Sequence, residues 1–236
     1  MKITEIKNTK IVLTGSKNPN DSKLDVEHCL PNNNHFGLFI GAAGSGKTSL
    51  VISLLTSKKF KSYRGVFDKI YLFSGSLNTL PQTFTDKLHE DRVFDNLDSL
   101  EEIMDELKQD EEHCKVLIII DDLVKEIKQY EPVLKKLAYN RRHYAGGVSL
   151  WMITQKLKGI PLSLRVAVDN LFCFANSLKN KNEAIQIHED FIIDFNKEQW
   201  LELINALFKT SPPYEFLYVN KVRDEYYKNF NKLVIE

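Results

Sequence analysis

A glycine-rich segment in the first quarter of the chain limits the fold more than any other feature of the sequence. It runs from Gly41 to Thr48, reads GAAGSGKT and matches the pattern GxxxxGK[ST]. Glycine lets the backbone turn through positive φ and come close to an anion, so that successive N–H groups surround phosphate oxygens at the start of a helix. An apolar run, 35–40, precedes the segment, and an apolar helical face follows within 47–55. The sequence therefore predicts a strand, a phosphate-binding loop and a helix, in that order.

Two side chains of this segment complete the chemistry of a nucleoside triphosphate site. Lys47 would place a cation against the β- and γ-phosphates, and the Thr48 hydroxyl would bind magnesium. A simple glycine-rich turn is the alternative, but the position between a strand and a helix favours the loop. We therefore expect ATP and Mg²⁺ as ligands. The expected nucleotide-binding residues are Gly41, Ala42, Ala43, Gly44, Ser45, Gly46, Lys47, Thr48 and Ser49.

A pair of acidic residues follows the most apolar segment of the chain. Val116 to Ile120 is an unbroken β-branched and leucine run, as expected for a strand buried on both faces, and Asp121 and Asp122 come directly after it. Asp121 is the expected magnesium ligand, acting through water. Asp122 would orient or activate the water that attacks the γ-phosphate. The alternative role for Asp122 is to cap the next helix, because Asp is favoured at that position.

Gln155 ends the next apolar strand, which begins at Val148. If this strand lies between the strand before the glycine loop and the strand before Asp121, the Gln155 amide faces the γ-phosphate. An amide there can bond to phosphate or water and so sense whether the γ-phosphate is present. A glutamine exposed to solvent at a strand end is the alternative.

The remaining pattern predicts an α/β fold with a mostly parallel central sheet covered by helices on both faces. The five core strands, numbered along the chain, are 35–40, 69–73, 116–120, 148–153 and 170–174, and their expected order in the sheet is 5-1-4-3-2. We expect one P-loop ATPase domain over 1–236. It comprises an N-terminal extension over 1–35 with a short strand or two, a catalytic core over 36–175, and C-terminal helices and a strand over 176–236. Ser99 and Glu102 predict a capping box, Pro132 a break between two helices, Trp200 to Phe208 a late helix, and Tyr214 to Val219 the last strand.

Composition narrows the class of protein. The formal net charge is +0, from 32 basic and 32 acidic residues, so any nucleic-acid contact must come from local basic patches. Three cysteines with no CxxC spacing indicate neither a disulfide framework nor a zinc site, even with His113 beside Cys114, and Cys173 is expected to be a buried thiol. The first residues lack an apolar signal core, and no run reaches membrane-spanning length. We expect a reducing, cytoplasm-like compartment and no membrane.

Basic residues suggest two further roles. An arginine from a neighbouring subunit often stabilises charge on the γ-phosphate during cleavage, and Arg141, Arg142 and Arg165 are the candidates. Each has a surface or salt-bridged arginine as its alternative. The segment 58–64, KKFKSYR, interleaves basic and aromatic residues, a composition that suits a DNA backbone with occasional base stacking. A solvated helix end is the other interpretation of that segment.

Taken in order, these segments resemble a known family. GAAGSGKT, VLIIIDDL, NRRHYAGGVSLWMITQ and IPLSLRVAVDNLFCF are similar to the genome-packaging ATPases of poxviruses, giant viruses, virophages and related mobile elements, in the FtsK–HerA group of P-loop motors. The similarity covers about residues 36–175. Its most specific marks fall on Arg142-His143 and on Arg165, while Lys47, Thr48, Asp121, Asp122 and Gln155 carry over by motif.

The resemblance implies a motor that pumps double-stranded DNA into a capsid with ATP. It implies a homo-oligomeric ring, pentamer or hexamer, together with capsid or portal proteins as partners. The implied location is the viral assembly site in the host cytoplasm, and the virion. Two other functions stay open: another P-loop enzyme, such as a nucleoside or nucleotide kinase, and a non-catalytic ATP-binding assembly subunit, against which the Asp121-Asp122 pair argues.

Overall fold

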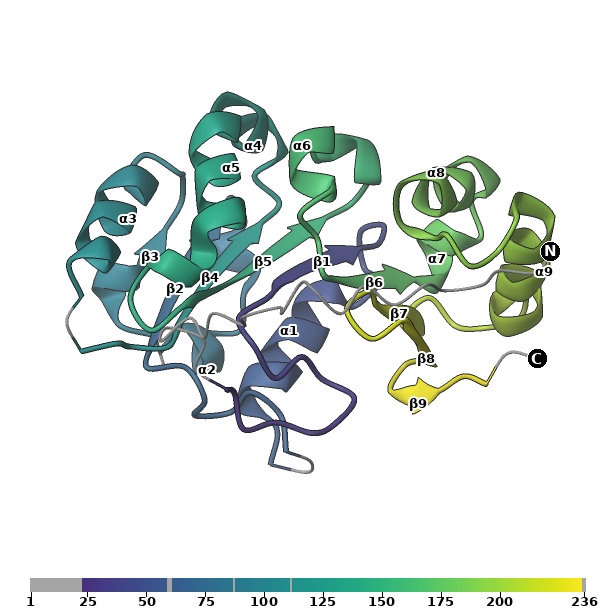
Figure 1. The fold of residues 1–236 in the computed structure, drawn as a ribbon, viewed down its shortest axis with the longest axis horizontal. Helices are drawn as coiled ribbons and strands as arrows, with labels where there is room; N and C mark the ends of the chain where they lie inside the picture. Colours follow the sequence, from purple (N-terminus) through teal and green to yellow (C-terminus); the bar gives the residue numbers. More distant parts are fainter. Residues whose placement is uncertain (1–22, 59–60, 87, 111, 235–236) are drawn as a thin grey trace, which may run out of the picture.

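The computed structural model describes residues 23–58, 61–86, 88–110 and 112–234, and its centre is a nine-stranded sheet covered by helices (Figure 1). The strands are β1 (Phe36–Ile40), β2 (Lys69–Ser74), β3 (Val93–Phe94), β4 (Val116–Asp121), β5 (Val148–Thr154), β6 (Asn170–Phe174), β7 (Phe216–Asn220), β8 (Glu225–Lys228) and β9 (Asn231–Lys232). The α-helices are α1 (Lys47–Thr56), α2 (Gln82–Thr85), α3 (Leu100–Lys108), α4 (Val124–Gln129), α5 (Glu131–Asn140), α6 (Leu162–Arg165), α7 (Ala175–Leu178), α8 (Lys181–Phe191) and α9 (Lys197–Phe208).

The order of the strands decides which side chains meet at the carboxyl edge of the sheet. It is β3-β2-β4-β5-β1-β6-β7-β8-β9, and every pairing from β3 to β6 is parallel. The five strands expected from the sequence stand in the expected order, with β5 between β1 and β4. The full order differs in detail, because β3 extends one edge and the antiparallel strands β7, β8 and β9 extend the other.

Alternate residues of the central strands pack on opposite faces of the sheet. Leu38 and Ile118 belong to one apolar core, whereas Phe39 and Ile119 belong to the other. The first core packs against α3 to α9 and the second against α1, α2 and the segment before β1, as the layers in Figure 1 show. Every residue of β4 and β5 is buried, as parallel strands covered on both faces require.

Two expectations about local structure are wrong, and a third falls mostly outside the described residues. Residues 23–35 contain no strand, and the rest of the expected N-terminal strand region, 1–22, lies outside the described residues. The strand expected over Tyr214 to Val219 is β7, which begins at Phe216 after the largely exposed Tyr214, and it is not the last strand, because β8 and β9 follow it. The Ser99 side chain forms no capping hydrogen bond at α3, because its backbone is already helical at φ −84° and ψ −1° whereas a capping residue is extended.

The late helix and the break at Pro132 are confirmed. α9 carries its own capping box, in which the Asn196 side chain accepts backbone N–H bonds and the Gln199 side chain accepts the N–H of Asn196. α4 and α5 are separate helices, and Pro132 lies in the first turn of α5, where its missing N–H costs nothing. Cys173 is fully buried, as expected. Within the described ranges, no helix is long and apolar enough to cross a membrane.

Candidate nucleotide-binding site

The glycine segment forms the turn between the end of β1 and the start of α1. Gly44 and Gly46 have positive φ angles, 74° and 95°, which other residues rarely adopt. Gly41 is required for a different reason, because a Cβ there would lie 2.4 Å from the Ser45 hydroxyl and 2.9 Å from the Cβ of Phe174. The backbone geometry that surrounds a phosphate therefore depends on these three glycines.

The loop holds one buried hydroxyl beneath residues that are exposed to solvent. The Ser45 hydroxyl is buried and has no hydrogen-bond partner among the described residues. The backbone N–H of Ala42 donates to the Asn176 side chain over 3.3 Å. Ala42, Ala43 and Gly44 themselves are exposed at the mouth of the loop. Buried polar atoms normally have partners, so an unpaired hydroxyl in this loop is consistent with a ligand that accepts hydrogen bonds.

The Lys47 side chain lies across the loop. Its ammonium donates to the carbonyl oxygens of Gly41, over 2.6 Å, and Ala42, over 3.0 Å. Burial lowers the pKa of Lys47, while the nearby carboxylates of Asp121 and Asp122 act in the opposite direction. The cation is therefore held between the loop and the acidic pair. Ser49, two residues after Lys47 in the first turn of α1, is exposed.

Thr48 and Asp121 bring two oxygen ligands together. The Thr48 hydroxyl donates to Asp121 Oδ2 over 3.5 Å, at the long limit of a hydrogen bond. Asp121 is 6% exposed, and burial, followed by the charge of Asp122, raises its pKa to about 6. A carboxylate in this setting is stabilised by a cation, and Mg²⁺ prefers oxygen ligands of these two kinds. The residues present thus fit a magnesium ion.

Asp122 and Gln155 form the second contact at the same edge. The Gln155 amide donates to Asp122 Oδ2 over 2.9 Å. Asp122 has a positive φ of 56°, a strained value for a residue other than glycine, and its N–H donates to the carbonyl of Ile153 on β5. Such strain is concentrated at functional sites. The capping alternative for Asp122 is not realised, because Leu123 precedes α4 and no side chain caps that helix.

The three candidate arginines lie in different surroundings. Arg141 pairs with Asp169 over 2.5 Å, and Arg165 pairs with Asp190 over 2.5 Å while also donating to the carbonyl of Ile160. Arg142 is exposed, and across the described residues it takes part in no ion pair. It precedes β5, and Gln155 follows that strand, so the length of β5 separates Arg142 from its own site by roughly 23 Å.

Two polar groups elsewhere have structural roles. In the basic segment, Lys61 pairs with Asp25, and Tyr63 is 2% exposed with its hydroxyl donating to Pro31. Tyr63 is therefore not free to stack on a base, and that part of the expectation is wrong. Residues 59 and 60 of the segment lie outside the described residues.

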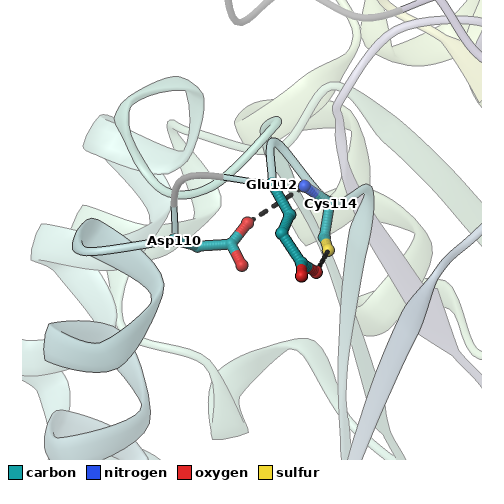
Figure 2. A group of neighbouring side chains, drawn as sticks. All are labelled: Asp110, Glu112 and Cys114. Atoms are coloured by element: carbon teal, nitrogen blue, oxygen red, sulfur yellow. Dashed lines mark hydrogen bonds between the residues drawn. The ribbon is translucent and has the colours of Figure 1, made fainter.

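Figure 2 shows the other group, Asp110, Glu112 and Cys114, on the connection between α3 and β4. Their potential ligand atoms lie within 4.8 Å of one another. Asp110 already accepts the ammonium of Lys69 over 2.9 Å and the N–H of Cys114 over 3.0 Å, and burial raises the pKa of the Cys114 thiol. These contacts join β2 to the start of β4, and we interpret the group as structural.

The sequence did not reveal the contribution of the strand after α6. Phe174, at the end of β6, and Asn176, at the start of α7, both contact the loop. The signal was available in the strand order, because β6 is parallel to β1 and its carboxyl end lies at the same edge. Ligands of parallel sheets bind at that edge, so the residues that follow every parallel strand, including β6, are candidates for contact with the ligand.

A family model described as Poxvirus A32 protein matches residues 26–222, from before β1 to the turn after β7. No curated protein sequence matches the chain.

Several solved structures share the fold. The genome packaging NTPase B204 from Sulfolobus turreted icosahedral virus 2, in complex with AMP, has a TM-score of 0.60 and 17% identity over 85% of this chain and 98% of that chain. The same protein in complex with ATP-gammaS gives 0.57 and 18%, covering 85% and 98%. B204, the DNA-packaging ATPase from Sulfolobus Turreted Icosahedral Virus, gives 0.57 and 17%, covering 90% and 98%. At these identities the likeness concerns the fold.

Proposed function

The chain belongs to the Poxvirus A32 protein family, and from this premise we propose that it is an ATP-hydrolysing motor that packages viral double-stranded DNA into a capsid. One observation carries the proposal. Lys47, the Thr48–Asp121 pair and the Asp122–Gln155 pair come from three different segments and meet at one edge of the sheet. A site that only binds nucleotide needs the loop, whereas the second acid and the amide serve hydrolysis.

In this proposal each residue has a distinct task. The loop N–H groups and Lys47 hold the phosphates, since an ammonium and oriented N–H groups stabilise charge that develops on phosphate oxygens. Asp122 accepts a hydrogen bond from the attacking water and orients it. Gln155 donates to Asp122 over 2.9 Å, so it fixes the direction of that carboxylate, and its amide N–H can donate to the γ-phosphate or the water instead.

The Thr48 hydroxyl and the Asp121 carboxylate would hold Mg²⁺. When bound, the ion neutralises charge on the phosphate oxygens. Asp121 holds its place through β4, where its Cα stands opposite Ser74 on one side and Ile153 on the other. The structures of B204 in complex with ATP-gammaS and with AMP support an adenine nucleotide as a ligand of this chain.

In the proposed motor, a neighbouring subunit supplies the arginine that stabilises charge on the γ-phosphate. Arg142 is the better candidate for the trans-acting arginine, because its side chain is exposed and roughly one strand length from its own site. Arg165 would first have to leave Asp190 and the carbonyl of Ile160. We therefore propose a ring, pentamer or hexamer, that acts on double-stranded DNA with capsid or portal proteins. It would act at the viral assembly site in the host cytoplasm and stay with the virion.

ATP hydrolysis measured with and without long double-stranded DNA, alongside native mass, tests the proposal. We expect a ring whose turnover rises when DNA is added. Turnover that requires a small phosphate acceptor instead of DNA would identify a kinase. Binding of ATP with no turnover under any condition would identify an assembly subunit.

A further inference from the structure

A short loop follows β5 at Gln155, and it carries two exposed lysines. Gln155, Lys156 and Lys158 are exposed, whereas Leu157 between them is fully buried. Because Leu157 is buried between them, Lys156 and Lys158 both extend into solvent on either side of it. Lys128, exposed on α4, lines the same groove of about 410 Å³ together with Asp122 and Gln155.

The loop is held firmly in this position. The N–H of Leu157 donates to the Glu183 carboxylate over 2.6 Å, and the Thr154 hydroxyl donates to the carbonyl of Lys156 over 3.1 Å. At Gly159 the backbone approaches α4 so closely that a Cβ would lie 3.1 Å from a methyl of Val124. Lysines on a fixed backbone lose less conformational entropy on binding a ligand than lysines on a mobile one.

The charge of this groove is unbalanced. Its lining holds Lys128, Lys156 and Lys158 but only one carboxylate, Asp122, which already accepts the Gln155 amide. None of the three lysines forms an ion pair within the part of the chain that the structure describes. A polyanion with regularly spaced charges fits such a groove better than a single small anion, because three separated ammonium groups can each meet a phosphate.

The basic groove at the far end of α1 is a weaker candidate for DNA binding. Lys58, Lys61, Arg64 and Lys115 line a groove at the far end of α1, but Asp25 and Asp68 line it as well, and Lys61 is paired with Asp25. Because the chain as a whole is neutral, a DNA contact has to be local. Both grooves carry an excess of two positive charges, and the groove beside Gln155 is favoured because none of its three lysines is ion-paired among the described residues.

We propose that the groove formed by Lys128, Lys156 and Lys158 binds the phosphate backbone of DNA. The proposal rests on the function proposed above, to which it adds the DNA-contacting surface. Gln155 and the two loop lysines lie within four consecutive residues, and Gln155 bonds to Asp122. A change at the γ-phosphate that breaks the Asp122–Gln155 bond therefore acts on the same short loop that holds the DNA.

The test is the salt dependence of binding to a long random-sequence DNA duplex. The double variant Lys156→Gln/Lys158→Gln keeps side-chain length and removes two charges. Lys58→Gln/Arg64→Gln removes two charges from the other basic surface and serves as the matched control. The slope of log Kd against log salt should change by about 1.8 for each subunit that contacts DNA at one time, because each lost phosphate contact contributes about 0.9. The control should keep the wild-type slope.

Each outcome has a clear meaning. The expected slope change in the loop variant alone supports the groove, and so does a further change of about 0.9 on adding Lys128→Gln. An unchanged slope in the loop variant, or equal changes in both double variants, overturns it while leaving the packaging function intact. If the wild-type chain binds no duplex and duplex does not stimulate hydrolysis, the packaging function fails and the groove assignment fails with it. Thermal unfolding midpoints within a degree or two of wild type establish that the variants are folded.

Discussion

His35 offers a quantitative test of the structure, because its environment fixes the protonation state of its ring. The side chain is 4% exposed, and its Nε2 accepts the indole N–H of Trp151 over 2.9 Å. Its Nδ1 lies 2.9 Å from the carbonyl of Asn33, so Nδ1 carries the proton and Nε2 has none. Burial lowers the pKa of His35 to about 4, against a smaller opposing effect of the Asn33 carbonyl.

The consequence for stability follows from proton linkage. The unfolded chain binds a proton at His35 near pH 6.5, whereas the folded chain does so only near pH 4, so stability is fully present above about pH 6.5 and falls as the pH drops toward 4. Between about pH 7.5 and about pH 5 the loss in the free energy of unfolding is about 2 kcal/mol. His35→Gln lacks this titration, so the difference in stability between wild type and variant should shrink by that amount.

Urea unfolding at the two pH values measures this difference, since all other titrating groups are common to both chains. His143→Gln, a change at an exposed histidine, is the control and should keep the wild-type pH dependence. If His35→Gln is too unstable to fold, an NMR titration of the His35 ring in the wild-type chain replaces it. Parallel pH dependence in wild type and His35→Gln, or a ring that titrates near pH 6.5, would show that the folded chain does not hold His35 neutral.

The other predictions concern the nucleotide site. Lys47→Ala should lower the rate of ATP hydrolysis on the order of 100-fold or more, measured by phosphate release, and full turnover would remove the loop from the mechanism. Gly41→Ala places a Cβ 2.4 Å from a buried hydroxyl and should weaken binding in an ATP-gammaS titration, so wild-type affinity would contradict the loop geometry. Asp122→Asn should reduce kcat by roughly 10²- to 10⁴-fold with little effect on nucleotide affinity. Mixing Asp122→Asn with Arg142→Ala subunits should restore hydrolysis, whereas complementation by Arg165→Ala instead would reverse the assignment.

The central sheet and the site edge could be predicted because they depend on local signals. Apolar runs that end in Asp121 and Gln155, together with the glycine loop, fix which strand ends must converge, and the parallel rule then orders the strands. β3 contains two residues and β9 two more, which is too short to leave a periodic pattern. These edge strands depend on neighbours distant in sequence rather than on their own residues.

The side-chain partners were beyond sequence reasoning for the same reason. Asp190 lies 25 residues from Arg165, and only the folded chain brings them to 2.5 Å. Tyr63 appeared as part of a basic, aromatic surface segment, yet its ring packs against Trp151 and His35 in the second core. Periodicity predicts burial within an element, but it gives no information on burial of an irregular segment between two elements.

Movement along DNA shows directly whether the protein is a motor. A duplex that carries a short third strand reports translocation, because a motor that moves past the triplex strips that strand into solution. We expect third-strand release that requires ATP and Mg²⁺ and is lost in Lys47→Ala. Steady ATP hydrolysis by the assembled chain with no third-strand release, in the presence of its capsid partner as well as in its absence, would contradict motor function.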